Sequence, residues 1–158
     1  MDFENVDLQA VLDDIAETGY STSQAGEQPS ASDLAGYRDL ADDGVGVVVV
    51  DTDALQSTDL RNLAQTVKDS GEAGAEASTV VVSAPNNTQV VSDVMSRYQI
   101  ESTQGELHGS TGPQDVAAFL SSAEDAQPAF SWIYVLAVAG VLLAVAATAV
   151  FARITYRR

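Results

Sequence analysis

Several residue types are absent or scarce in this 158-residue chain, and each scarcity excludes a kind of site. There is no cysteine, so the chain can form neither a disulfide nor a thiolate metal site. The single histidine, His108, lies in a polar stretch that we interpret as an exposed loop, and it cannot build a histidine-rich metal site. Lys and Arg together number 7 against 23 Asp and Glu. Nucleic acid is therefore excluded as a partner, because phosphate contacts need clustered basic side chains.

An uncharged run of 24 residues, 129–152, lies close to the end of the chain. As a helix it would be roughly 36 Å long, enough to cross a hydrocarbon core of about 30 Å with some tilt. Trp132 and Tyr134 lie near its start, and Phe151 and Tyr156 near its end, as is typical of the two membrane interfaces. The run predicts a single transmembrane helix, followed by a short basic tail over 153–158.

Charge on either side of the run predicts its orientation. All 23 acidic residues but only four of the 7 basic ones precede it, a formal charge of −19, whereas three arginines follow it. The positive-inside rule therefore favours a cytoplasmic C-terminus and an acidic domain outside the cell membrane. The first 19 residues do not resemble a signal peptide, which favours the alternative of a cytoplasmic tail-anchored scaffold.

Small residues recur along one face of the predicted transmembrane helix. Gly140, Ala144 and Thr148 are spaced four apart, a pattern that permits close packing of two helices in lipid. The pattern makes a homo-oligomer formed through the anchor one interpretation. The other is that Gly and Ala are simply common in membrane helices.

The residues before the run predict one α/β domain. We expect an amphipathic helix within 1–19, a flexible linker over 20–30, and a compact acidic domain over 31–124. Two valine-rich runs, 45–50 and 79–82, are typical of strands buried on both faces of a mainly parallel sheet. Helices are expected from about 32 to 40, 57 to 68, 88 to 98 and 113 to 120, with a short edge strand within 99–106. The fold class is a small, mainly parallel βαβ sheet with right-handed crossovers and flanking helices.

Two acidic residues directly follow the first valine strand and are the main candidates for chemistry. Asp51 and Asp53 could hold Mg²⁺ or Ca²⁺ weakly, because ligands of open α/β sheets bind beyond the carboxyl ends of the strands. The pattern resembles the first motif of the haloacid-dehalogenase phosphatases, and Ser83 resembles their second. No lysine follows Ser83, although that family needs one. We therefore expect Asp51 and Asp53 to end a strand and cap a turn, with no enzyme activity and no cofactor. A weak metal-dependent phosphatase or hydrolase is the alternative.

Two segments carry a family resemblance: SDLAGYRDLADDGVGVVVVDTDALQSTDLRNLAQTVKDS and ASTVVVSAPNNTQVVSDVMSRY, followed by an anchor that ends in arginines. This order resembles small actinobacterial single-pass membrane proteins whose α/β domain is similar to the TPM domain. The resemblance implies a βαβ sandwich that makes protein contacts in the cell envelope, near NlpC/P60-type cell-wall hydrolases or the division machinery. It assigns no site residue. We expect a membrane-anchored interaction or regulatory module.

Overall fold

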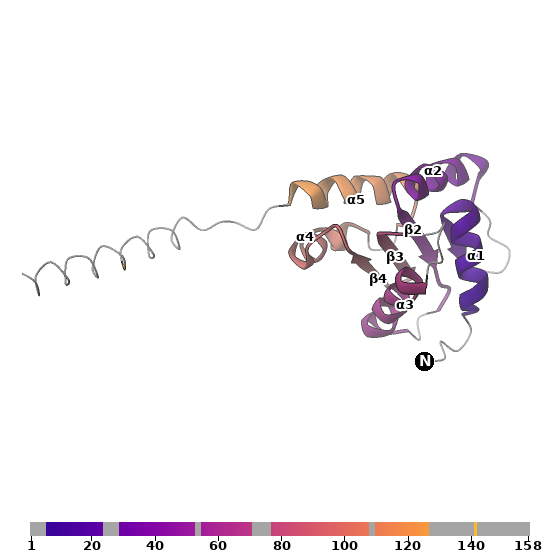
Figure 1. Ribbon diagram of the computed structural model, residues 1–158, viewed down its shortest axis with the longest axis horizontal. Helices are drawn as coiled ribbons and strands as arrows, with labels where there is room; N and C mark the ends of the chain where they lie inside the picture. Colours follow the sequence, from indigo (N-terminus) through magenta and orange to yellow (C-terminus); the bar gives the residue numbers. More distant parts are fainter. Residues whose placement is uncertain are drawn as a thin grey trace, which may run out of the picture. The chain divides into compact units, whose positions relative to one another are not determined.

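A computed structural model describes residues 6–23, 29–52, 55–70, 77–107, 110–126 and 141. The part up to Ala126 forms one compact unit, shown in Figure 1. Its elements are α1 (Leu8–Thr18), β1 (Tyr20–Thr22), α2 (Ala31–Asp42), β2 (Val45–Val49), α3 (Ser57–Ser70), β3 (Thr79–Ala84), β4 (Asn87–Ser92), α4 (Arg97–Thr103), the 3₁₀ helix η1 (Gln104–Leu107) and α5 (Pro113–Asp125).

The strands form one sheet in the order β1-β2-β3-β4. β1, β2 and β3 are parallel, and β4 pairs antiparallel with β3. In this register, Val48 of β2 lies opposite Ser21 of β1 on one side and opposite Val82 of β3 on the other. The predicted mainly parallel sheet with flanking helices is confirmed.

Alternate valines of the central strands face two separate cores. Val48 and Val82 pack in the core under α1 and α3, whereas Val47 and Val81 pack in the core under α2, α4 and α5. Successive side chains of a strand point to opposite faces, so a strand covered on both faces is apolar at every position. The domain therefore has three layers, helices, sheet and helices, as Figure 1 shows.

The two parallel crossovers differ in hand, which corrects the prediction that both are right-handed. β1, β2 and β3 follow one another in a single direction across the sheet. α2, which connects the first two strands, packs on one face, and α3, which connects the next two, packs on the other. Because the direction is the same and the faces are opposite, one crossover is left-handed, an arrangement seen in only about 2% of such connections.

The predicted helix over 88–98 is wrong, because Asn87–Ser92 is strand β4. Val90 and Val91 were interpreted as one stripe of a helix. In the structure they face opposite cores, as neighbouring residues of a strand do. Pro85 and Asn86 form a two-residue turn that pairs β4 with β3, and this pairing overrides the local helical pattern.

The predicted edge strand within 99–106 is also wrong, since α4 and η1 occupy this segment. Ser96 begins α4 with a capping box: its hydroxyl accepts from the Gln99 N–H, and the Gln99 side chain accepts from the Ser96 N–H. The linker predicted over 20–30 is wrong at its start, where Tyr20–Thr22 pair with β2 as β1. Only Tyr20 of these residues packs against a core, and the polar Ser21 and Thr22 hid the strand in the sequence. Residues 24–28 lie outside the described residues.

The other predicted helices are confirmed within a few residues. α1 buries Val11 and Ile15 against the sheet, so it is part of the compact unit. α2 begins at Ala31, one residue before the predicted start, with Ser30 as its N-cap. α5 opens with Pro113 and runs to Asp125, beyond the predicted end at Leu120.

Candidate functional site

Asp51 lies at the carboxyl edge of the sheet, where the sequence predicted it. It is exposed, and its backbone N–H donates to the Ser23 hydroxyl at 2.9 Å, which ties the end of β2 to the end of β1. Asp53, the second candidate ligand, lies outside the described residues. Within the described ranges, no three or more His, Asp or Glu side chains gather as a metal site. The weak Mg²⁺ or Ca²⁺ site remains a prediction.

Ser83, the other residue of the phosphatase-like pattern, is buried inside the β3–β4 hairpin. Its hydroxyl lies 3.0 Å from the Thr88 hydroxyl, which in turn donates to the Leu107 carbonyl at 3.2 Å. These contacts join the hairpin to η1. The Ser83 hydroxyl therefore has a structural role in the core, and it is not presented to a ligand at the sheet edge.

The remaining sequence candidates lie outside the described residues. These are His108, the small-residue face of the anchor (Gly140, Ala144 and Thr148), and, apart from Val141, the whole run 129–152. Among the helices that the structure describes, none combines the length and the apolar character needed to cross a bilayer. The transmembrane helix thus remains a prediction from the sequence.

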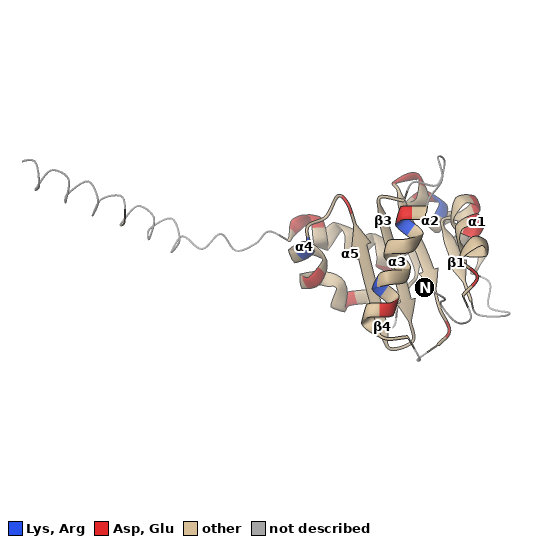
Figure 2. Cartoon of the chain, turned by 60° about the horizontal axis from the view of Figure 1, so that its bottom comes forward, with Lys and Arg blue, Asp and Glu red and all other residues tan. Residues whose placement is uncertain are grey.

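Acidic side chains are spread over the outer surface of the domain. Figure 2 marks acidic residues in red along several helices, α1, α2 and α4 among them, with few basic residues between them. α1 and α5 have no basic residue in the last turn, nor has α2. The surface would repel anionic lipid and attract basic protein segments.

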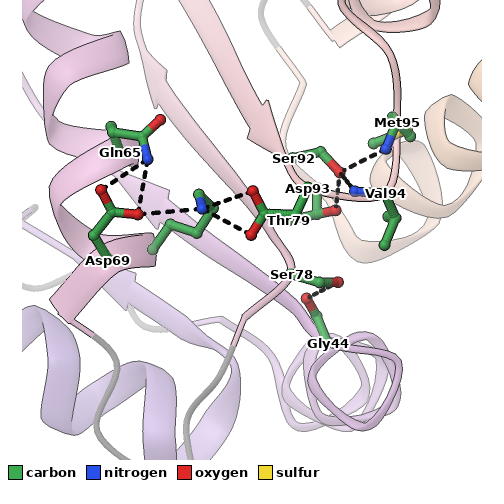
Figure 3. Close-up of polar contacts among 10 residues, drawn as sticks. Gly44, Gln65, Asp69, Ser78, Thr79, Ser92, Asp93, Val94 and Met95 are labelled. Atoms are coloured by element: carbon green, nitrogen blue, oxygen red, sulfur yellow. Dashed lines mark hydrogen bonds and ion pairs between the residues drawn. The ribbon is translucent and has the colours of Figure 1, made fainter.

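A tightly hydrogen-bonded turn follows β4 at the opposite edge of the sheet, where α2 and α3 end and β3 begins. We call residues 92–95 the Val94 turn. The Ser92 hydroxyl accepts from the N–H groups of Val94 and Met95, each at 3.1 Å, and lies 2.8 Å from the Thr79 hydroxyl (Figure 3). One side chain therefore holds the backbone of the turn and attaches it to β3.

Asp93 fixes the same turn to two further elements. Its N–H donates to the Ser78 carbonyl at 2.9 Å, and both carboxylate oxygens accept from Lys68 Nζ at 2.8 Å. Lys68, the only lysine of the chain, is also 3.2 Å from Asp69, and its side chain is 10% exposed. The hydrogen bonds that Lys68 donates, to Asp93 first and to Asp69 second, raise the pKa of Lys68. The Gln65 amide and Lys68 lower the pKa of Asp69. The turn is thus tied to α3 and to the residue before β3.

The side chain at the tip of this turn points into solvent. Val94 is 72% exposed, whereas its neighbour Met95 is buried in the core. A groove of about 510 Å³ lies beside them. Its walls come from the end of α2, the starts of β2 and β3, the Val94 turn and the second half of α5: Leu40, Asp43, Val45, Ser78, Thr79, Val94, Met95, Ala117, Leu120, Ser121 and Glu124. We call it the α2–α5 groove.

This surface was not predicted, because the segment 88–98, which includes Val94, was expected to be a helix. The one local signal was Ser92, since Ser favours turns through hydrogen bonds to backbone N–H groups one to three residues further on. Nothing in the local pattern shows that Lys68, 25 residues away, binds Asp93.

Fold and surface together define a small three-layer α/β protein with an acidic exterior and a groove beside a fixed apolar turn. The family described as Membrane protein Rv1476 matches residues 4–158, and the chain belongs to it. It is therefore a membrane protein, as the apolar run predicts. No curated protein and no solved structure matches the chain.

Proposed function

We propose that this protein is a single-pass membrane protein whose acidic domain binds a partner protein of the bacterial cell envelope and positions or regulates it. The observation that carries the proposal is Val94, an aliphatic side chain 72% exposed on a turn that hydrogen bonds hold to two other segments, α3 and the start of β3. Single exposed apolar residues are common on proteins. An exposed one on a fixed turn, beside an open groove, has the features of a binding surface.

Fixing the turn in advance favours binding, because side chains and loops that are already ordered lose less entropy when a partner docks. Four attachments order the Val94 turn: two backbone N–H groups bound by Ser92, the Asp93 N–H bound by Ser78, and the Asp93 carboxylate bound by Lys68. The buried side chain of Met95 adds a fifth. A partner would therefore meet Val94 in one position.

The family and the sequence support the membrane part of the proposal. The family is one of membrane proteins, and the run 129–152 is the segment suited to span the bilayer. The three arginines after the run favour an extracytoplasmic domain and a cytoplasmic C-terminus. The resemblance to single-pass proteins with a TPM-like domain motivates the choice of an envelope or division partner.

Orientation is tested by labelling intact cells with a membrane-impermeant maleimide. The chain has no cysteine, so Ala35→Cys in the exposed face of α2 is a single reporter that touches no described hydrogen bond of a side chain. Labelling before lysis is expected. Labelling only after lysis, in step with a cytoplasmic control protein, would contradict the envelope assignment and support the cytoplasmic tail-anchored scaffold.

Partner binding is tested by photo-crosslinking in intact cells. A benzophenone side chain at Ala117, which is exposed and lines the α2–α5 groove, should give a discrete adduct. The same group at Ala35, exposed on α2 outside the groove, is the matched control and should give none. In isolated membranes the Ala117 adduct should weaken as salt rises, because the surface is acidic. Identical adduct patterns from both positions would contradict a specific partner.

A weak metal-dependent hydrolase is the second candidate, favoured by the exposed position of Asp51 at the carboxyl edge of the sheet. It requires phosphatase activity that depends on Mg²⁺ and is lost in Asp51→Asn. Activity that is unchanged in this variant would eliminate the site.

A further inference from the structure

The α2–α5 groove has both apolar walls and an acidic rim. Leu40, Met95 and Leu120 contribute apolar surface, and Val94 extends it outward. Among the described residues that line the groove, the charged ones are Asp43, the C-cap of α2, and Glu124, near the end of α5. An occupant must therefore present apolar side chains to the centre and positive charge to the rim.

The rim is more negative than these two carboxylates alone. α2 ends at Asp42 with Asp43 as its C-cap, and α5 ends with Glu124 and Asp125. The C-terminus of a helix carries partial negative charge and is stabilised by cations, yet neither helix has a basic residue in its last turn. Two helix C-termini without a cation in their last turns thus lie beside the groove, and a cationic side chain from outside would be attracted to both the carboxylates and the helix ends.

We propose that the α2–α5 groove binds a basic amphipathic segment of a partner protein, with its apolar face on Leu40, Met95 and Leu120 and its Lys or Arg side chains against Asp43 and Glu124. This inference rests on the proposed function and names the chemistry of the partner. Apolar anchors on one face with charge on the flanks are the usual features of a peptide that docks in a groove.

Charge and membrane topology exclude three other occupants of the groove: a second copy of this chain, an anionic lipid surface and the chain's own basic tail. A second copy would bring another domain of formal charge −19 to an acidic rim, and anionic lipid would be repelled in the same way. The arginines of the chain's own tail follow the predicted membrane span, so in a single-pass protein they lie across the bilayer from the domain. A segment of a different protein remains.

Methionine methyl NMR gives a direct test, because Met1 and Met95 are the only methionines. Met95 lines the groove. The full chain, with ¹³C-methyl methionine and in nanodiscs of zwitterionic phosphatidylcholine, is titrated with a synthetic Leu/Lys peptide whose leucines recur at helical spacing. The Met95 resonance should move and saturate while that of Met1 stays. A scrambled peptide, and one with Glu in place of Lys, should leave Met95 unmoved.

Matched variants separate the contribution of the apolar Val94 to peptide binding from that of the acidic rim. Val94→Ser should weaken peptide binding about fivefold or more, whereas Tyr98→Ser, at a residue 48% exposed outside the groove, should not. Asp43→Asn combined with Glu124→Gln should weaken it about two- to tenfold. Each variant is compared only if its free Met95 resonance shows that it is folded.

A second pair of exposed acids serves as the charge control. Glu106→Gln combined with Glu17→Gln, at two exposed acids on η1 and α1 that do not line the groove, makes the same change in net charge and should leave the affinity within about twofold. A Met95 resonance that does not move, or that moves equally with the Glu peptide, would overturn the inference. So would a shift that depends on protein concentration without peptide, which would indicate self-association. A discrete crosslinked partner that Val94→Ser still binds would overturn this inference while leaving the proposed function intact.

Discussion

Gly19 joins α1 to β1 in a conformation that other residues rarely adopt, and replacing it should be costly. Its φ is 74°, in the left-handed region. Its N–H donates to the Ile15 carbonyl at 2.8 Å, which caps α1, and its carbonyl accepts from the Val47 N–H at 2.9 Å, which begins the β1–β2 pairing. A Cβ here would lie 2.4 Å from the Tyr37 carbonyl oxygen and 2.7 Å from the Ala41 Cβ.

The expected cost of Gly19→Ala has two parts. The left-handed conformation costs about 1–2 kcal/mol for a residue with a Cβ. Forcing α1 away from the α2 backbone adds about 1–3 kcal/mol, the usual cost of overpacking. We therefore expect the free energy of unfolding to fall by about 2–5 kcal/mol, a large part of the 5–15 kcal/mol that is typical of a domain.

Gly44→Ala is the matched control, because Gly44 has nearly the same φ, 77°. Its nearest neighbour would be the Ser78 hydroxyl oxygen at 3.0 Å, which can rotate away if it gives up its 3.2 Å hydrogen bond to the Gly44 carbonyl. This variant should lose the conformational part, about 1–2 kcal/mol, and about 1 kcal/mol for that hydrogen bond, but no overpacking part. Urea unfolding of the full chain, followed by the native Met95 methyl signal, measures both. Equal losses in the two variants would refute the close approach of Gly19 to α2.

Three further predictions concern the core and the ion pair. Phe119→Ala should lower the free energy of unfolding by about 3–5 kcal/mol, since the ring is fully buried under α5; urea titration measures the loss, and one below about 1 kcal/mol would contradict the packing. Burial first, then the neighbouring Tyr20 and the carboxylates of Asp33 and Asp115, raise the pKa of Tyr37, whose hydroxyl donates to the Thr111 carbonyl at 2.7 Å. The contribution of the protonated Tyr37 hydroxyl to the free energy of unfolding is therefore complete below its unfolded pKa of 10.0 and is lost as pH rises. An ultraviolet titration follows the ionisation of the five tyrosines, and Tyr37→Phe should remove its last phase. The pKa of Lys68 is likewise raised, so the stability advantage of the native chain over Lys68→Met should be constant between neutral pH and pH 10.5 and shrink above it. Urea midpoints across this range measure it, and an advantage that persists at higher pH would argue against the Asp93 ion pair.

The strands and most helices could be predicted because their causes are local. Val45 to Val50 are apolar at nearly every position, and only a strand covered on both faces buries them all. The stripe of Leu60, Leu63 and Val67 identifies α3 in the same way. The run 129–152 indicates a membrane span by length and lack of charge alone, and the family agrees that this is a membrane protein.

Other features depend on residues distant in the chain, and only the tertiary structure decided them. Val90 and Val91 fit a helix until β3 offers a pairing partner, and the polar residues of β1 resemble a linker until β2 does. The exposure of Val94 follows from Ser92 and Asp93 binding Thr79 and Lys68, which no local pattern encodes. Periodicity shows which face of an element is apolar, but it does not show what covers that face, because burial is a property of the packed chain and not of the segment.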